Sequence, residues 1–177
     1  KEDQQRFKQT VSWALSWVVV IALPAAVGLA ILAGPLVATL FHYGAFNGVD
    51  VLMAKRALMA FSLGLVFFIA VKVVVSTFYA QKDMKTPVKV ATLALVINVI
   101  LNALLVGPLA HVGLALATSL TAGVNFVVLL TILSRRGQFK VSVEMAWLMV
   151  KVGVAVVAMA AVIEYFKAAQ SLWLQWS

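Results

Sequence analysis

The chain of 177 residues contains no cysteine, which excludes disulfide bonds, thiolate metal sites and cysteine nucleophiles. Charged residues are also scarce, at 11% of the sequence against about 25% in soluble globular proteins. Neither His42 nor His111 has a second ligand at metal-binding spacing, so no metal site is expected. The sequence also lacks a glycine-rich phosphate loop, a Ser-His-Asp set and a carboxylate pair within an apolar segment. An enzyme is therefore not expected.

Apolar residues, by contrast, make up 64% of the chain and gather in five long runs. A membrane-spanning helix needs about 20 mainly apolar residues to cross about 30 Å of hydrocarbon. The runs lack the in-out alternation of barrel strands, so they are predicted to be helices, which satisfy their own backbone groups in lipid. The expected fold class is all-α, a polytopic integral membrane helix bundle. The five runs are residues 11–40, 57–80, 87–106, 112–133 and 145–163.

The first run is longer than a bilayer requires, at about 45 Å of straight helix. Pro24 is the natural position for a kink, and Gly34-Pro35 is a natural break near the outer face. Residues 42–50 would then form an outer loop. The chain begins with Lys1 rather than methionine and has no cleavable signal pattern, so we expect it to be a piece of a longer protein.

The positions of the basic residues predict an orientation. If the runs cross alternately, nine Lys and Arg residues fall on the side of the N-terminus and three on the opposite side. Positive loops stay cytoplasmic, so the N-terminus is expected inside and the C-terminus outside. The net charge of +8 does not indicate nucleic-acid binding, because the basic residues lie in short loops between helices rather than on one soluble face.

Lys72 is the basic residue that stands out, because it lies well inside the second run. A charge there costs about 2.5 to 3.5 kcal/mol on insertion scales unless it faces protein or water. Two interpretations stay open. The side chain could snorkel toward the cytoplasmic end of its helix near Ala80, or it could face a water-filled cavity and attract an anionic head group.

Polar side chains within the third and fourth runs allow two roles. Asn98 and Asn102 are one turn apart and share a helix face, and Thr118 lies in the next run. The first interpretation is hydrogen bonding and packing between helices, which the small and polar stripe of Gly113, Ala117, Thr121 and Asn125 favours. In the alternative, Asn98, Asn102 and Thr118 supply neutral oxygens to a monovalent cation.

One passage carries a resemblance to a known family. Residues 78–87 read FYAQKDMKTP, and with the preceding Lys72 they resemble the span-loop-span passage of the MurJ (MviN) lipid II flippases. The short passages ALP at 22–24, GPL at 34–36 and GPL at 107–109 resemble the same family in the same order. This resemblance covers nearly the whole chain.

The resemblance implies a fold of the multidrug/oligosaccharidyl-lipid/polysaccharide exporter class, in which these runs correspond to helices nine to thirteen of fourteen. Residues 1–140 would be four helices of the C-terminal lobe, and residues 141–177 an additional helix at a groove for the lipid tail, followed by an outer segment. The partner implied is an N-terminal lobe of the same chain, missing here. That lobe would carry most of the arginines that meet the substrate pyrophosphate.

The implied function is alternating-access transport of the lipid-linked peptidoglycan precursor, lipid II, from the cytoplasmic to the periplasmic leaflet of the bacterial inner membrane, for cell wall synthesis. The resemblance implies lipid II and membrane lipids as partners. It implies no cofactor, and the energy source would be Na⁺ or the membrane potential. Two alternatives remain: another carrier of the same fold, such as a polysaccharide-lipid flippase or drug/cation antiporter, and a membrane scaffold that transports nothing.

Overall fold

The computed structural model describes residues 2–41, 48–139 and 143–174, and within these ranges the chain forms four long helices and no strand. The helices are α1 (Glu2–Phe41), α2 (Gly48–Ala80), α3 (Lys85–Arg135) and α4 (Val143–Leu174). Each is long and apolar enough to cross a membrane. The prediction of an all-α, multi-pass membrane protein is confirmed.

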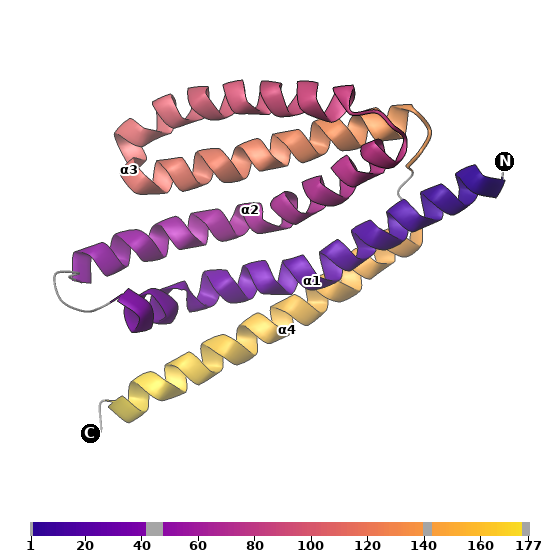
Figure 1. Cartoon of the computed structure of the whole chain (residues 1–177). Helices are drawn as coiled ribbons and strands as arrows, with labels where there is room; N and C mark the ends of the chain where they lie inside the picture. Colours follow the sequence, from indigo (N-terminus) through magenta and orange to yellow (C-terminus); the bar gives the residue numbers. More distant parts are fainter. Residues whose placement is uncertain (1, 42–47, 140–142, 175–177) are drawn as a thin grey trace.

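Helix α3 contains the third and fourth apolar runs. Its 51 residues would extend about 77 Å as a straight helix, more than twice the hydrocarbon thickness. The chain reverses at Ala110, where φ is 47° and ψ is −126°, so two arms lie side by side (Figure 1). At the reversal Gly113 leaves no room for a side chain, because a Cβ there would collide with the carbonyl oxygen of Leu105. The four helices thus contain the five predicted runs.

The helices pack in the order α4, α1, α2, α3, and each contacts only its neighbours in that order among the described residues (Figure 1). Near the turn between α2 and α3, one apolar core joins side chains from all four helices. It includes Leu15 of α1, Phe78 of α2, Leu133 of α3 and Met145 of α4. Elsewhere most of the helix surface is exposed, with only 11 to 28% of each apolar window buried, so the bundle offers wide apolar faces to lipid or further helices.

Two helix ends differ from the sequence prediction. The break expected at Gly34-Pro35 is wrong, because α1 continues to Phe41. Helix α2 begins at Gly48, nine residues before the apolar run and inside the loop expected at 42–50; residues 42–47 lie outside the described ranges. Hydropathy identifies the part of a helix that lipid surrounds, and polar residues can continue the helix beyond it.

A lysine from α4 explains how α1 passes through Pro35. Proline has no N–H, so the carbonyl oxygen of Ile31, four residues earlier, loses its helical donor. The Lys167 ammonium donates a hydrogen bond to that oxygen at 3.2 Å and pairs with Glu164 at 2.9 Å. Lys167 therefore satisfies the backbone group that the proline leaves open and ties α4 to α1.

This contact predicts a non-additive pair of substitutions. Lys167→Met should lower the free energy of unfolding by about 1 kcal/mol, the net value of one hydrogen bond. In a Pro35→Ala background the same change should cost much less, because the alanine supplies the missing N–H to Ile31. Thermal unfolding of the four proteins in detergent measures the coupling. Equal losses of unfolding free energy in both backgrounds would show that Lys167 does not compensate for the N–H that Pro35 lacks.

A candidate polar cavity between α2 and α3

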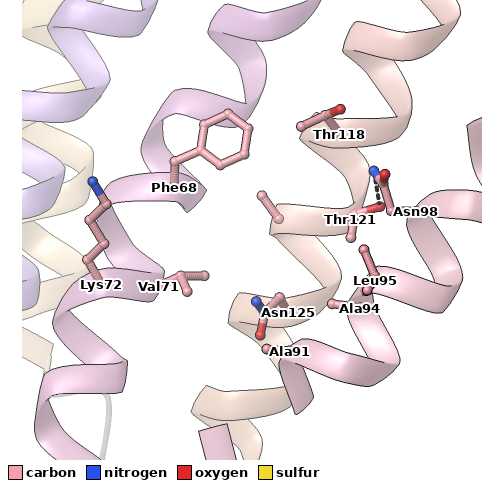
Figure 2. A pocket seen from close by; sticks show the side chains of 11 residues that line it. Phe68, Val71, Lys72, Ala91, Ala94, Leu95, Asn98, Thr118, Thr121 and Asn125 are labelled. Carbon is pink, nitrogen blue, oxygen red and sulfur yellow. Dashed lines mark hydrogen bonds between the residues drawn. The ribbon is translucent and has the colours of Figure 1, made fainter. Parts of the chain in front are cut away.

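A cavity of about 430 Å³ lies between α2 and the two arms of α3, and eleven side chains line it (Figure 2). Six of them are apolar, and the other five carry polar groups. The polar members are Lys72 from α2, Asn98 from the first arm of α3, and Thr118, Thr121 and Asn125 from the second arm. Sequence analysis selected all five as candidates for substrate, cation or packing roles, and the structure brings them to one place.

Helical periodicity explains why these residues share the cavity. Positions three, four and seven apart lie on one helix face. Ala91, Ala94 and Asn98 present such a face on the first arm of α3, as do Thr118, Thr121 and Asn125 on the second. Small side chains among them leave open space that bulky ones would fill. The pattern within each helix was visible in the sequence, whereas the meeting of the three faces was not.

A chain of hydrogen bonds fixes the two arms of α3 to each other. The Asn102 amide donates to Asn98 Oδ1 at 2.9 Å, and the Asn98 amide donates to Thr121 Oγ1 at 3.3 Å. Thr121 in turn donates to the carbonyl oxygen of Ala117 at 2.7 Å. Asn98 and Asn102 do share a face, as predicted, and Asn98 and Thr121 bond across the helix pair. Asn102 does not line the cavity, and its Oδ1 is buried without a hydrogen-bond partner among the described residues.

The small and polar stripe of the fourth run packs mainly against the first arm. Gly113 faces Leu105, Ala117 is fully buried, and Thr121 bonds to Asn98. Asn125, at the end of the stripe, lines the cavity, and its Oδ1 has no hydrogen-bond partner in the part of the chain that the structure describes. The packing role of these four residues remains a prediction that their close contacts favour.

Sequence analysis missed the tightest contact between α2 and α3. Ser119 is buried, and its hydroxyl donates to the carbonyl oxygen of Ala60 at 2.8 Å. A Cβ on Gly64 would lie 2.6 Å from Ser119 Oγ and 2.8 Å from Ser119 Cα, so the two backbones nearly touch. Ala60 and Gly64 form a small-xxx-small pair, and that signal could have indicated a close helix contact.

Lys72 brings a positive charge to the cavity wall. Its side chain is exposed, and within the described residues it has neither a hydrogen-bond nor an ion-pair partner. Figure 2 shows the side chain running back along α2 to the level of Phe68, away from the Ala80 end of the helix. This direction follows from helix geometry, since side chains tilt toward the N-terminus. It argues against snorkelling toward Ala80, and the cavity interpretation rests on the place of Lys72 among the lining residues.

A second polar cluster closes the bundle at the turn between α2 and α3. The Asp83 carboxylate accepts hydrogen bonds from the Thr86 hydroxyl at 2.7 Å and the Thr86 N–H at 3.1 Å. Arg136, just past the end of α3, donates to Asp83 at 2.7 Å and lies 5.4 Å from the centre of the Phe78 ring. These partners, the Thr86 hydroxyl first, lower the pKa of Asp83 from 3.8 to about 2. The cluster holds both ends of α3 together.

The lowered pKa of Asp83 predicts the pH range in which acid lowers the stability of the protein. A carboxyl that binds its proton less tightly in the folded state stabilises the fold above its unfolded pKa. The contribution of Asp83 should be complete above about pH 4 and should disappear as the pH falls through about 2. Thermal unfolding of wild type and Asp83→Asn should therefore differ at pH 6 and converge at pH 2. A difference that does not change with pH would contradict the role of this carboxylate.

The passage with the Asp83 cluster is also the one that resembles a known family, and comparison with known proteins tests that resemblance. A family model described as lipid II flippase MurJ matches residues 1–177. The chain belongs to the MurJ family. A probable lipid II flippase MurJ of Haemophilus influenzae is 36% identical over 167 residues, which cover 94% of this chain and 32% of the relative. The resemblance found in the sequence is confirmed.

Two further MurJ relatives match the chain with similar identity and coverage. A probable lipid II flippase MurJ of Vibrio cholerae is 33% identical over 170 residues, covering 96% of this chain and 32% of the relative. The lipid II flippase MurJ of Burkholderia cenocepacia is 36% identical over 140 residues, covering 79% of this chain and 27% of the relative. The chain thus spans about a third of the length of the MurJ relatives it matches.

Proposed function

We propose that this chain is part of a lipid II flippase, a transporter that moves the lipid-linked peptidoglycan precursor from the cytoplasmic to the periplasmic leaflet. The match of the MurJ family model to residues 1–177 carries this proposal. The geometry agrees with it, because the bundle combines wide apolar faces with a polar cavity that has a cation on its wall. Lipid II needs both, since it joins a pyrophosphate and a muropeptide to a very long undecaprenyl tail.

Lys72 is the residue to which we assign contact with the anionic head group. Its ammonium attracts phosphate oxygens, and the amides and hydroxyls of the same cavity can donate or accept hydrogen bonds without adding charge. The bonds from Asn98 to Thr121 and from Ser119 to Ala60 connect the three cavity walls. We therefore propose that α2 and both arms of α3 move as one body when the transporter changes its access.

We also propose different roles for two parts of the chain. Residues 1–140 would be four spans of one transporter lobe that works against an N-terminal lobe of the same protein. Residues 141–177 would be an additional span beside the lipid tail, with an outer segment after it. Supporting this, α4 contacts only α1 among the described helices and exposes Val150, Val154, Val157 and Val162.

The orientation that the basic residues predict belongs to the same proposal. The N-terminus and the turn with Asp83 would lie in the cytoplasm, and the C-terminus in the periplasm, with the protein in the bacterial inner membrane. Figure 1 shows the start of α1, the turn between α2 and α3 and the end of α3 at one end of the bundle, and the basic residues Lys8, Lys82 and Arg136 of these segments support this choice. A single cysteine introduced at Lys82 should therefore react with a permeant thiol reagent and resist an impermeant one in intact spheroplasts.

Complementation tests the proposed function. A gene encoding the full-length protein should restore growth to a strain depleted of its own lipid II flippase. The matched control is a polysaccharide-lipid flippase of the same fold, expressed to the same level, which should not restore growth. If the full-length protein is well inserted and still fails, the alternatives gain support: a carrier with another cargo, or a scaffold that transports nothing.

The three residues predicted to bind a monovalent cation fit that role only in part. Asn98 and Thr118 line the cavity, whereas Asn102 lies outside the lining and is bonded to Asn98. All three offer neutral oxygens, no carboxylate belongs to the lining, and the Lys72 ammonium on the same wall repels a second cation. We therefore propose that the membrane potential, rather than Na⁺ bound at these residues, supplies the energy for transport.

Exchange of salts tests this proposal. A Na⁺ site occupied at a hundred times its Kd would stabilise the protein by about 2.7 kcal/mol. We expect instead the same thermal unfolding midpoint in NaCl and in KCl of equal ionic strength, for the wild type and for Thr118→Val. Stabilisation by Na⁺ alone, lost in Thr118→Val, would establish the cation site and overturn the proposal.

A further inference from the structure

A second cavity, of about 580 Å³, lies between α1 and the first turns of α4, on the face of α1 away from the α2/α3 cavity. Its lining includes Lys8, Ser12, Trp13 and Ser16 from α1, and Glu144 from α4. The lining thus holds a cation, an anion, two hydroxyls and an indole ring. None of these residues belongs to the transport cavity described above, so the inference below is independent of the proposed function.

Lys8 and Glu144 line the same cavity without forming an ion pair with each other. Within the described residues, neither Lys8 nor Glu144 has an ion-pair or hydrogen-bond partner, although both line the same cavity. Two opposite charges that face one space without pairing suit a ligand that carries both signs. The Ser12 hydroxyl can donate to the anionic part of such a ligand, whereas the Ser16 hydroxyl already donates to the carbonyl oxygen of Ser12 at 2.9 Å.

The position of the cavity along the helices indicates the level of the lipid head groups. Lys8 belongs to the polar first turns of α1, and the apolar run begins three residues later at Val11. Trp13 contacts Trp17 edge to face at a ring distance of 6.0 Å, and Trp147 of α4 lies 5.5 Å below the Lys151 ammonium. Tryptophans of this kind mark the boundary between hydrocarbon and head groups.

We propose that this cavity binds the head group of a zwitterionic phospholipid with a primary amine, phosphatidylethanolamine. Lys8 and the Ser12 hydroxyl bind the phosphate, and Glu144 accepts hydrogen bonds from the ammonium, with Trp13 beside it. Phosphatidylcholine lacks the N–H groups that Glu144 needs. Phosphatidylglycerol offers Glu144 no cation, so the carboxylate repels it. The bound lipid would fill the gap between α1 and α4.

Lipid retention by the full-length protein tests this site. The protein is purified from vesicles that contain equal amounts of phosphatidylethanolamine and phosphatidylcholine, and mass spectrometry counts the bound lipids. The wild type should retain phosphatidylethanolamine about tenfold over phosphatidylcholine, as expected for one or two charge-assisted hydrogen bonds. Lys8→Gln and Glu144→Gln should each reduce the preference to about twofold or less. The control Lys89→Gln, an exposed lysine outside the cavity, should keep it.

A charge-exchange variant distinguishes loss of the binding site from unfolding of the single variants. The double variant Lys8→Glu/Glu144→Lys should recover a clear preference for phosphatidylethanolamine, because the cavity again offers one charge of each sign. Equal retention of the two lipids by the wild type would overturn the proposal, as would a preference that survives both single substitutions. A cross-link from a cysteine at Ser12 to another helix of the full-length protein, instead of to lipid, would overturn it as well.

Discussion

Lys72→Leu is expected to abolish transport without lowering the stability of the protein. In our proposal the substitution removes the cation that the cavity offers to the pyrophosphate, and the loss of one charge-assisted contact corresponds to at least about a tenfold fall in transport. It breaks no hydrogen bond or ion pair within the described residues, so the stability should not fall. Complementation of a flippase-depleted strain measures the first effect, and thermal unfolding in detergent measures the second.

A loss of transport without a loss of stability separates a role in transport from a structural role. Lys72→Arg should retain most of the transport, because it keeps the charge in the same place. Lys89→Leu serves as the matched control, since Lys89 is an exposed lysine near the start of α3 and does not line the cavity. Normal growth with a well-inserted Lys72→Leu protein would support the scaffold alternative, in which Lys72 faces lipid and has no function.

Gly64→Leu is expected to separate α2 from α3 and to destroy the cavity. Even the Cβ of alanine would lie 2.8 Å from Ser119 Cα, and no rotation of a side chain can relieve a contact with the backbone. Overpacking of this kind costs about 1 to 3 kcal/mol, and a leucine should exceed that range. Both the thermal unfolding midpoint and complementation should fall, because Lys72 would lose its position relative to Asn98.

Gly153 of α4 provides the control for this prediction. Apart from its chain neighbours and the adjacent backbone of its own helix, no described residue lies within 4 Å of a Cβ at Gly153, so Gly153→Ala should stabilise the helix by up to about 1 kcal/mol through helix propensity alone. Gly64→Ala should destabilise the protein in the same assay. If both alanine variants gain stability, then α2 and α3 do not approach as closely as the Ser119 contact requires.

The sequence was sufficient to predict the number of apolar runs and the family. Long hydrophobic segments are a strong signal because lipid leaves a helix no other way to satisfy its backbone. Asn98 and Asn102 could be placed on one face for a similar reason, since helical periodicity is local. Helix ends were less accurate. Nothing local to Gly34-Pro35 reveals that Lys167, 136 residues after Ile31, satisfies the carbonyl oxygen that the proline leaves open.

For the candidate site, too, patterns within one helix could be predicted from the sequence, whereas contacts between helices could not. Each polar residue of the cavity could be selected from its own helix, but only the structure brings Lys72 together with Asn98 and Thr118. The contact of Ser119 with Ala60 was missed because the two residues are 59 positions apart. The place of Lys72 in the cavity lining likewise needed the structure, and it favoured the cavity interpretation over snorkelling.

The most direct test of the central claim measures lipid II at the outer face of the inner membrane. In cells that depend on the full-length protein, an externally added enzyme that cleaves lipid II and cannot cross the membrane should find its substrate. Our account predicts cleavage at the level of a strain with its native flippase, and little cleavage with Lys72→Leu. Absence of cleavage with a well-expressed wild-type protein would contradict the assignment as a lipid II flippase.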